Sequence, residues 1–151
     1  MNAIPFASIL ISGLLAGNEL AVALFIHPVL YTAPDEAHVR IVKPLAGRLG
    51  RYMPFWYAAS LVFMILQLCV TPRGAAAAWW SCCAAAILFA VIIVLTIMFP
   101  VPINNRIAAL DLDHLPPDWM RLRRRWDVYH DVRVLFLIVV LGLLVFSALS
   151  A

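Results

Sequence analysis

Residues 75–99 read AAAAWWSCCAAAILFAVIIVLTIMF and contain no charged side chain. A helix that crosses the hydrocarbon core of a bilayer needs about 20 mostly apolar residues. Three further apolar runs occupy residues 6–30, 54–70 and 132–148. The predicted fold class is therefore all-α, a transmembrane antiparallel four-helix bundle.

The composition agrees with this fold class. Of the 151 residues, 65% are hydrophobic and 13% are charged, and the mean hydropathy is +0.96. These values lie outside the range of soluble domains, so residues 1–151 are predicted to form a single transmembrane domain. The first run lacks a basic leader and a small-residue cleavage site, which favours a retained helix over a signal peptide. The net charge of +3 comes from residues that flank the spans, which argues against nucleic-acid binding.

Basic residues gather in the connection between the first two runs and in the connection before the fourth run. The positive-inside rule therefore predicts that both long connections face the cytoplasm and both termini face out. We expect an integral membrane protein of a bacterial inner membrane. The lipid bilayer is then its first partner.

The helix boundaries follow from the prolines. Pro116-Pro117-Asp118 resembles a helix start, and no later proline interrupts the chain, so the fourth helix should begin in the cytoplasm. Pro34 and Pro44 break a mixed apolar and basic stretch, which predicts short interfacial helices that could cover a site. The expected membrane helices are 6–30, 54–70, 75–99 and 118–149.

The last helix carries a polar stripe. Spacings of three, four and seven residues place on one face Trp119, Leu122, Arg123, Trp126, His130, Arg133 and Leu137. The remaining charged residues are expected to face water or headgroups, namely Arg121, Arg124, Asp127 and Asp131. Anchoring of the helix at the interface is the alternative interpretation of the stripe.

The first helix has an unusual face as well. Gly13 and Gly17 have the spacing that lets helices approach closely, within the chain or between the copies of a homo-oligomer. The same side should carry Ala16, Leu20, Leu24 and His27 toward the bundle. Ionisable residues inside membrane spans are functional candidates, although a neutral His27 could instead bond the backbone freed by Pro28. Glu19 should be protonated, or paired with a group that the sequence does not identify.

The three cysteines, Cys69, Cys82 and Cys83, are interpreted as small packing residues. A disulfide between Cys69 and one of the other two remains open.

An antiparallel topology brings distant residues to one end of the bundle. The end of the first helix, the segment after the third and the start of the fourth supply His27, Asn104, Asn105, Trp126, His130 and Arg133. Together they would form a pocket with imidazoles as ligands or acid and base groups, amides for orientation, arginines for an anion and apolar walls.

Three motifs resemble a known family: His27-Pro28 after a glycine-rich helix, Pro102 followed by Asn104-Asn105, and Trp126-x-x-x-His130-x-x-Arg133. They are similar to the anthrone oxygenase-like family of small four-helix membrane proteins. The resemblance implies a membrane-embedded oxidoreductase or monooxygenase that oxidises an activated carbon in a hydrophobic aromatic substrate, anthrone-like or quinol-like.

The resemblance leaves three cofactor hypotheses. Haem b is the first, with His27, His130 or both as axial ligands, propionates near Arg123 and Arg133, and Trp126 and Asn104 as further cofactor-binding residues. The second is cofactor-free oxygenation, in which a histidine removes a proton and Arg133 and Asn105 stabilise the anion. Copper or iron on the two histidines is the third. A non-enzymatic membrane partner and a small transporter subunit are the alternatives outside catalysis.

Overall fold

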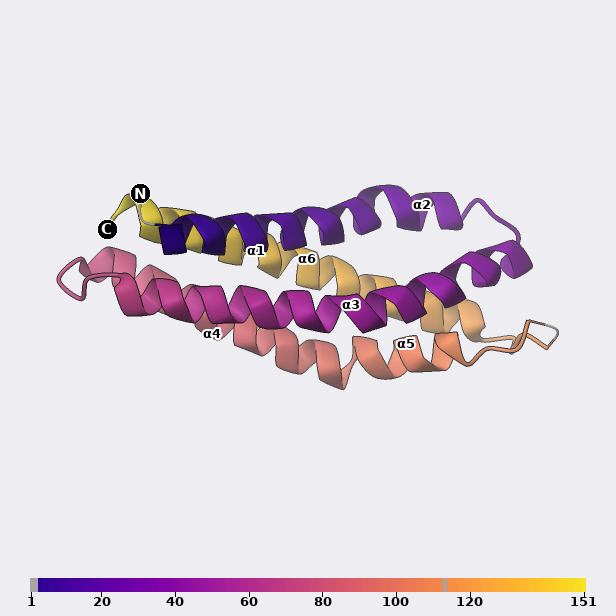
Figure 1. Cartoon of the computed structure of the whole chain (residues 1–151). Coiled ribbons are helices and arrows are strands. Elements are labelled where there is room, and N and C mark those ends of the chain that lie inside the picture. Colours follow the sequence, from indigo (N-terminus) through magenta and orange to yellow (C-terminus); the bar gives the residue numbers. More distant parts are fainter. Residues whose placement is uncertain (1–2, 113) are drawn as a thin grey trace.

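The computed structural model describes residues 3–112 and 114–151. In chain order its elements are α1 (Ala3–Ala21), the π-helical segment η1 (Val22–Ile26), α2 (His27–Leu30), α3 (Asp35–Val70), α4 (Ala76–Met98), α5 (Pro100–Ala108) and α6 (Trp119–Leu149). The helices form an elongated bundle of rods lying side by side, with both termini at one end (Figure 1). The described residues include no strand, so the prediction of an all-α fold is confirmed.

Four helical stretches are long and apolar enough to span a membrane: Ala3–Leu30, Asp35–Val70, Ala76–Ala108 and Trp119–Leu149. The chain is therefore an integral membrane protein. We call the end that carries residues 31–34, 109–112 and 114–118 the loop end, and the opposite end, with both termini, the terminal end (Figure 1).

The second span differs from its prediction. Helix α3 begins at Asp35 rather than at Pro54 and runs without a break through Pro44 and Pro54. The expected short interfacial helices are therefore wrong. A proline removes one helical hydrogen bond and crowds the preceding turn, but a helix held by neighbours on both sides of the proline tolerates that loss. Here the early turns of α3 are held by Val39 and Val42, which are buried in the core at the loop end.

The other boundaries lie closer to their predictions. Helix α6 begins one residue later than expected and α4 ends one residue earlier. The first span is not a uniform α-helix, because five of its residues form the π-helical segment η1. The third span continues past Phe99 as the separate helix α5.

The core has two parts. Toward the terminal end, one cluster joins residues of α1, α3, α4 and α6, namely Leu15, Ala16, Tyr57, Met64, Cys82, Ala85, Phe89, Ile92, Leu137, Val140 and Leu144. At the loop end, a second cluster contains Leu30, Val39, Val42, Ile103, Ile107, Leu110, Trp119 and Trp126. Polar side chains, described below, occupy the level between the two clusters.

Small residues and cysteines have modest roles. A Cβ added to Gly13 would lie 3.7 Å from a methyl carbon of Leu141, which is ordinary packing against α6, whereas Gly17 has nothing within 4 Å among the described residues. The homo-oligomer suggested by the glycine spacing stays a prediction.

All three cysteines are free, so the disulfide left open above is absent.

Replacing Phe89 with alanine tests the core. Phe89 is fully buried and stacks on Tyr57 with ring centroids 5.5 Å apart. In water-soluble cores such a truncation costs about 3–5 kcal/mol, and we expect a smaller loss here because lipid also solvates the separated helices. Thermal unfolding in detergent should show a clear fall in Tm for Phe89→Ala. Ile87→Ala, at a position 66% exposed, should change the Tm little; equal effects of the two substitutions would contradict the packing described.

Candidate active site

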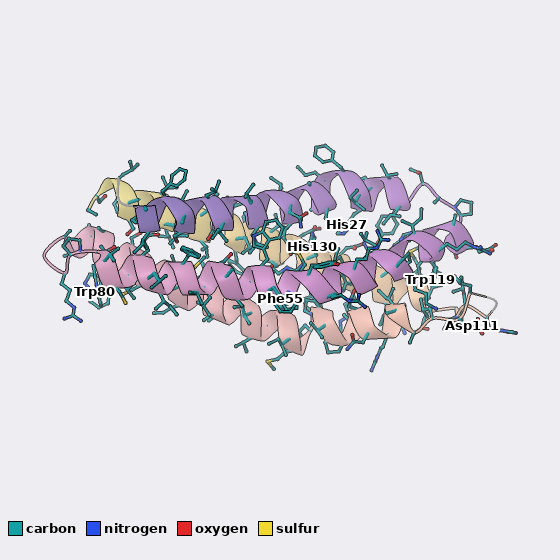
Figure 2. The ribbon with its side chains drawn as sticks, viewed as in Figure 1. His27, Phe55, Trp80, Asp111, Trp119 and His130 are labelled. Atoms are coloured by element: carbon teal, nitrogen blue, oxygen red, sulfur yellow. The ribbon has the colours of Figure 1, made fainter. Side chains whose placement is uncertain are left out.

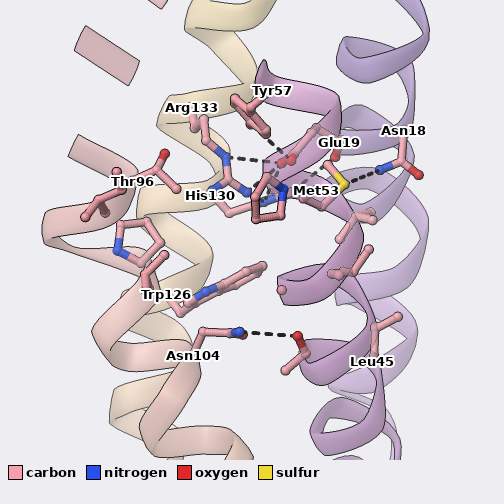
Figure 3. A pocket seen from close by; sticks show the side chains of 18 of the residues that line it. Asn18, Glu19, Leu45, Met53, Tyr57, Thr96, Asn104, Trp126, His130 and Arg133 are labelled. Carbon is pink, nitrogen blue, oxygen red and sulfur yellow. Dashed lines mark hydrogen bonds and ion pairs between the residues drawn. The ribbon is translucent and has the colours of Figure 1, made fainter. Parts of the chain in front are cut away.

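A cavity of about 360 Å³ lies inside the bundle at the level between the two core clusters (Figure 3). That volume falls in the range of small-molecule sites, about 300–1,000 Å³. Most of its lining is apolar and comes from α3, α4 and α5. Its charged and imidazole side chains all come from the first span and α6, namely Glu19, His27, Arg123, His130 and Arg133, and Asn18 of the first span adds an amide. The other three helices add Tyr57, Thr96 and Asn104.

The centre of the polar wall is a buried ion pair between Glu19 of α1 and Arg133 of α6. Glu19 Oε2 accepts hydrogen bonds from Arg133 Nη2 at 2.6 Å and from Arg133 Nε at 3.2 Å. The hydroxyl of Tyr57 on α3 donates to Glu19 Oε1 at 3.2 Å. Arg133 and Tyr57 are therefore the partners of Glu19 that the sequence did not identify, and the cluster links three helices.

His130 belongs to the same cluster (Figure 3). Its Nε2 lies 3.1 Å from the backbone oxygen of Glu19, and because a carbonyl oxygen only accepts, Nε2 carries a proton. Its Nδ1 lies 2.8 Å from Arg133 Nη2 and 3.1 Å from Glu19 Oε2. Trp126 stacks on the ring at an interplanar angle of 13°. Both nitrogens thus have partners, and the ring is fixed in place.

His27 is placed differently. Its side chain is 5% exposed and lines the cavity, but its Nε2 has no hydrogen-bond partner among the described residues. Its Nδ1 lies 3.6 Å from Asp127 Oδ1. A carboxylate beside Nδ1 favours the tautomer with the proton on that atom, which leaves a lone pair on Nε2. His27 therefore has the arrangement of a general base.

Asp127 is itself held by two further groups. Arg123 Nη2 lies 2.8 Å from its Oδ1, and the hydroxyl of Tyr31 donates to its Oδ2. Partial burial and the Asp127 carboxylate raise the pKa of the Tyr31 phenol, so Tyr31 stays a neutral donor. The prediction that Asp127 faces water or headgroups is wrong. The buried face of α6 is wider at this level than the predicted stripe, because His27 and Tyr31 pack over Asp127 as well.

The π-helical segment η1 brings His27 to the cavity. Glu19 and His27 are eight residues apart, and at the roughly 100° per residue of an α-helix they would point about 80° away from each other. A π-helix turns less per residue because its hydrogen bonds close a wider ring. The five π-helical residues therefore rotate His27 onto the face of Glu19. The predicted inward stripe was right for His27 and Ala16 but wrong for Leu24 and Gly17, which are exposed.

The structure brings together most of the residues that the sequence singled out. The cavity is lined by His27, Asn104, Arg123, Trp126, His130 and Arg133. Asn105 is exposed and does not line it, whereas the neighbouring Asn104 donates to the backbone oxygen of Ala46 at 3.3 Å. The partners Asp127, Tyr31 and Tyr57 were missed. A helical spacing of four residues, Arg123 to Asp127 and His27 to Tyr31, was the available signal.

The two histidines do not fit a haem that uses both of them as axial ligands, and a haem on one of them stays a prediction. An iron held by both would lie between the two imidazoles, on opposite faces of the porphyrin. Instead the rings of His27 and His130 touch edge-on, with centroids 4.8 Å apart. The two residues lie near each other about halfway along the bundle (Figure 2). Both nitrogens of His130 are also occupied. In the described part of the chain, no group of three or more His, Cys, Asp or Glu side chains is arranged to hold a metal ion.

Breaking the central ion pair should destabilise the bundle. Arg133→Met leaves the Glu19 carboxylate buried without its cation, which typically costs about 3–5 kcal/mol. The double variant Glu19→Gln with Arg133→Met should recover part of that loss, because no unpaired charge is left. Unfolding in detergent measures both. Arg40→Met removes an exposed pair with Glu36 and should cost under about 1 kcal/mol; a similar loss for Arg133→Met would contradict the role given to the buried pair.

Comparison with known proteins adds one finding. No curated protein and no solved structure matches the sequence. The anthrone oxygenase family matches residues 38–143, which is more than half of the chain and includes Asn104, Trp126, His130 and Arg133. The match begins after His27, so it covers the cavity lining contributed by α3, α4, α5 and α6 but not Asn18, Glu19, Val22 and His27 of the first span. The chain therefore belongs to the anthrone oxygenase family.

Proposed function

We propose that this protein is a membrane-embedded oxygenase that deprotonates a hydrophobic, anthrone-like or quinol-like aromatic substrate and lets the resulting anion react with O₂. The observation that carries the proposal is the Nε2 of His27, which has no hydrogen-bond partner in the part of the chain that the structure describes. The imidazole is buried and lines a largely apolar cavity, with Asp127 beside its other nitrogen. Family membership supports the reaction class.

The first step is a proton transfer to His27 Nε2 from an acidic C–H or O–H of the substrate. The imidazolium that forms donates from Nδ1 toward the Asp127 carboxylate, which stabilises it. The substrate becomes an electron-rich anion. Its negative oxygen requires donors, and Arg123 lines the cavity with an Nε that has no hydrogen-bond partner in the described residues. Arg133 supplies further positive charge at the same wall.

The overall reaction needs no separate electron donor when the substrate is an anthrone. The methylene carbon loses two hydrogens and gains one oxygen atom as a carbonyl. The second oxygen atom of O₂ leaves with the two hydrogens as water. The carbon gives up four electrons and O₂ accepts four, so the equation balances with O₂ as the only oxidant.

This proposal favours the cofactor-free hypothesis over haem. Its support is the edge-on contact of the two imidazoles and the occupied nitrogens of His130. We also propose that the loop end faces the cytoplasm of a bacterial cell and the termini face out, because basic residues concentrate at the loop end.

His27→Gln is the direct test. Glutamine keeps a polar group of similar size but does not take up a proton, so oxidation of anthrone by protein in nanodiscs should fall by about 10²–10⁴-fold. The matched control is His114→Gln, at a side chain 87% exposed, which should keep full activity. Oxygen consumption and anthraquinone formation are measured together. A His27→Gln protein with more than half of the normal activity sinks the proposal, as does a Soret band in the unmodified protein that His27→Gln or His130→Gln removes.

Asp127→Asn tests the positioning of the base. The amide keeps the shape of the side chain but no longer stabilises the imidazolium, and it favours the wrong tautomer of His27, so we expect kcat to fall between about 10- and 10⁴-fold with KM nearly unchanged. Tyr31→Phe, which only removes a hydrogen bond to the same carboxylate, should have a smaller effect in the same direction. A rise in KM with unchanged kcat would show that Asp127 serves binding and not the base.

A further inference from the structure

The cavity reaches the outer surface of the bundle on one side. Among its lining residues, Pro54 and Ala58 of α3 are exposed, and so are Ile97 of α4 and Val101 of α5. Ile97 is 60% exposed and Val101 is 40% exposed. A residue that both lines a cavity and contacts the surroundings marks an opening, so the opening lies between α3 on one side and α4 with α5 on the other.

Specific contacts close the bundle on either side of this opening. Toward the terminal end, the stacked rings of Tyr57 and Phe89 join α3 to α4. Toward the loop end, the hydrogen bond from Asn104 to the Ala46 backbone joins α5 to α3, and a dashed line from Asn104 marks it in the lower half of the close view (Figure 3). The opening is therefore a window with defined edges. We call it the α3/α4–α5 window.

Residue types at the window explain why the helices do not close it. Ala58 has only a methyl side chain, and Gly50 has none. Pro54 and Pro100 have no N–H, so each leaves a carbonyl without its usual helical donor, at Gly50 and at Thr96 respectively. Pro100 also begins α5 directly after the break at Phe99. The window thus has an apolar frame with backbone acceptors set into it.

The surface around the window is apolar on both helices. Exposed apolar side chains on the terminal-end side of Pro54 and beside Ile97 are Phe55, Val62, Val94, Leu95 and Met98, whereas the exposed Arg51 lies one turn before Pro54 on the loop-end side. Both helical stretches are long and apolar enough to span a membrane. A window framed in this way within membrane spans faces lipid hydrocarbon and not water. A polar ligand would have to leave its hydration shell before reaching it, whereas a molecule dissolved in the hydrocarbon would lose nothing comparable.

We propose that the substrate enters the cavity from the side, out of the hydrocarbon layer of the membrane and through the α3/α4–α5 window. The side chains of Ala58 and Ile97 set the largest width of a ring system that can pass. The proposal rests on the proposed function for the identity of the substrate. It narrows the substrate class to flat, uncharged, fused-ring aromatics that dissolve in lipid. Charged or sugar-linked derivatives are excluded at the window.

The test is kinetic, because a narrowed entrance slows entry and exit equally and leaves the equilibrium unchanged. Protein in nanodiscs is mixed rapidly with lipid-dissolved anthraquinone, and binding is followed by quenching of tryptophan fluorescence, since Trp126 lines the cavity. In Ala58→Phe, association and dissociation should both slow by tenfold or more, with Kd within twofold of that of the unmodified protein. The matched control is Val62→Phe, one helical turn away on the same face and outside the cavity lining, which should bind at the normal rates.

A second variant guards against misfolding of the first. Ile97→Ala removes the side chain on the opposite edge of the window and should speed association. The proposal is overturned if Ala58→Phe and Val62→Phe bind at equal rates, if Ala58→Phe weakens Kd without slowing association, or if anthraquinone does not bind the unmodified protein. An unmodified protein that shows the expected rates but does not oxidise anthrone supports the window and refutes the proposed function.

Discussion

The ion pair between Glu19 and Arg133 is the constraint on which the rest of the site depends. Within membrane spans neither charge has water to solvate it, and an unpaired charge at that depth costs several kcal/mol. The pair therefore fixes α1 against α6 at one register. Because His130 bonds to the backbone and the carboxylate of the same glutamate, its ring takes its position from that register too. Tyr57 ties α3 to the same point.

A second ion pair, Arg123 with Asp127, lies on the same wall, and the two pairs leave the fixed charges around the cavity balanced. This balance suits a neutral substrate. An unbalanced charge in an apolar cavity would attract water and ions, which would compete with an aromatic ring for the cavity. Transfer of a proton from the substrate to neutral His27 creates one anion and one cation side by side. The total charge in the cavity is unchanged, and the attraction between the new anion and cation, which is stronger in a low dielectric, offsets part of the cost of forming two charges away from water.

The sequence predicted the parts of this structure that depend on hydropathy and periodicity. Four apolar runs and the position of Pro116-Pro117 were enough to predict that there are four spans and where α6 starts, but not where α3 starts. Helical spacing predicted the buried face with Trp126, His130 and Arg133. Departures from a regular helix could not be predicted in the same way. A proline predicts the end of a helix, but α3 continues through two prolines because neighbouring helices hold it on both sides. No residue type marks the π-helical segment η1.

Partners across helices were equally hidden from the sequence. Glu19 and Arg133 are 114 residues apart in the chain, and a single sequence carries no sign that they meet. Asp127 was predicted to face water or headgroups because it lies outside an apolar stripe about 100° wide on α6. The segment around Tyr31 covers that part of α6 as well, so the buried face of the helix is wider there. A local pattern describes one helix, whereas burial is decided by what the neighbouring helices cover.

The two walls of the cavity differ in kind, and the difference orients a substrate. The first span and α6 supply the ion pairs and both imidazoles, whereas α3, α4 and α5 supply mainly aliphatic side chains and prolines. A flat aromatic that enters between α3 and α4–α5 meets the polar wall with its leading edge, so its acidic hydrogen and its oxygen are brought to His27 and Arg123 while the hydrocarbon rings stay among apolar side chains. O₂ is also apolar and dissolves more readily in hydrocarbon than in water, so the same apolar side of the cavity supplies both reactants. In the proposed reaction, the apolar side chains around the rings would keep away water, which would otherwise compete for the anion and for the donors of the arginines.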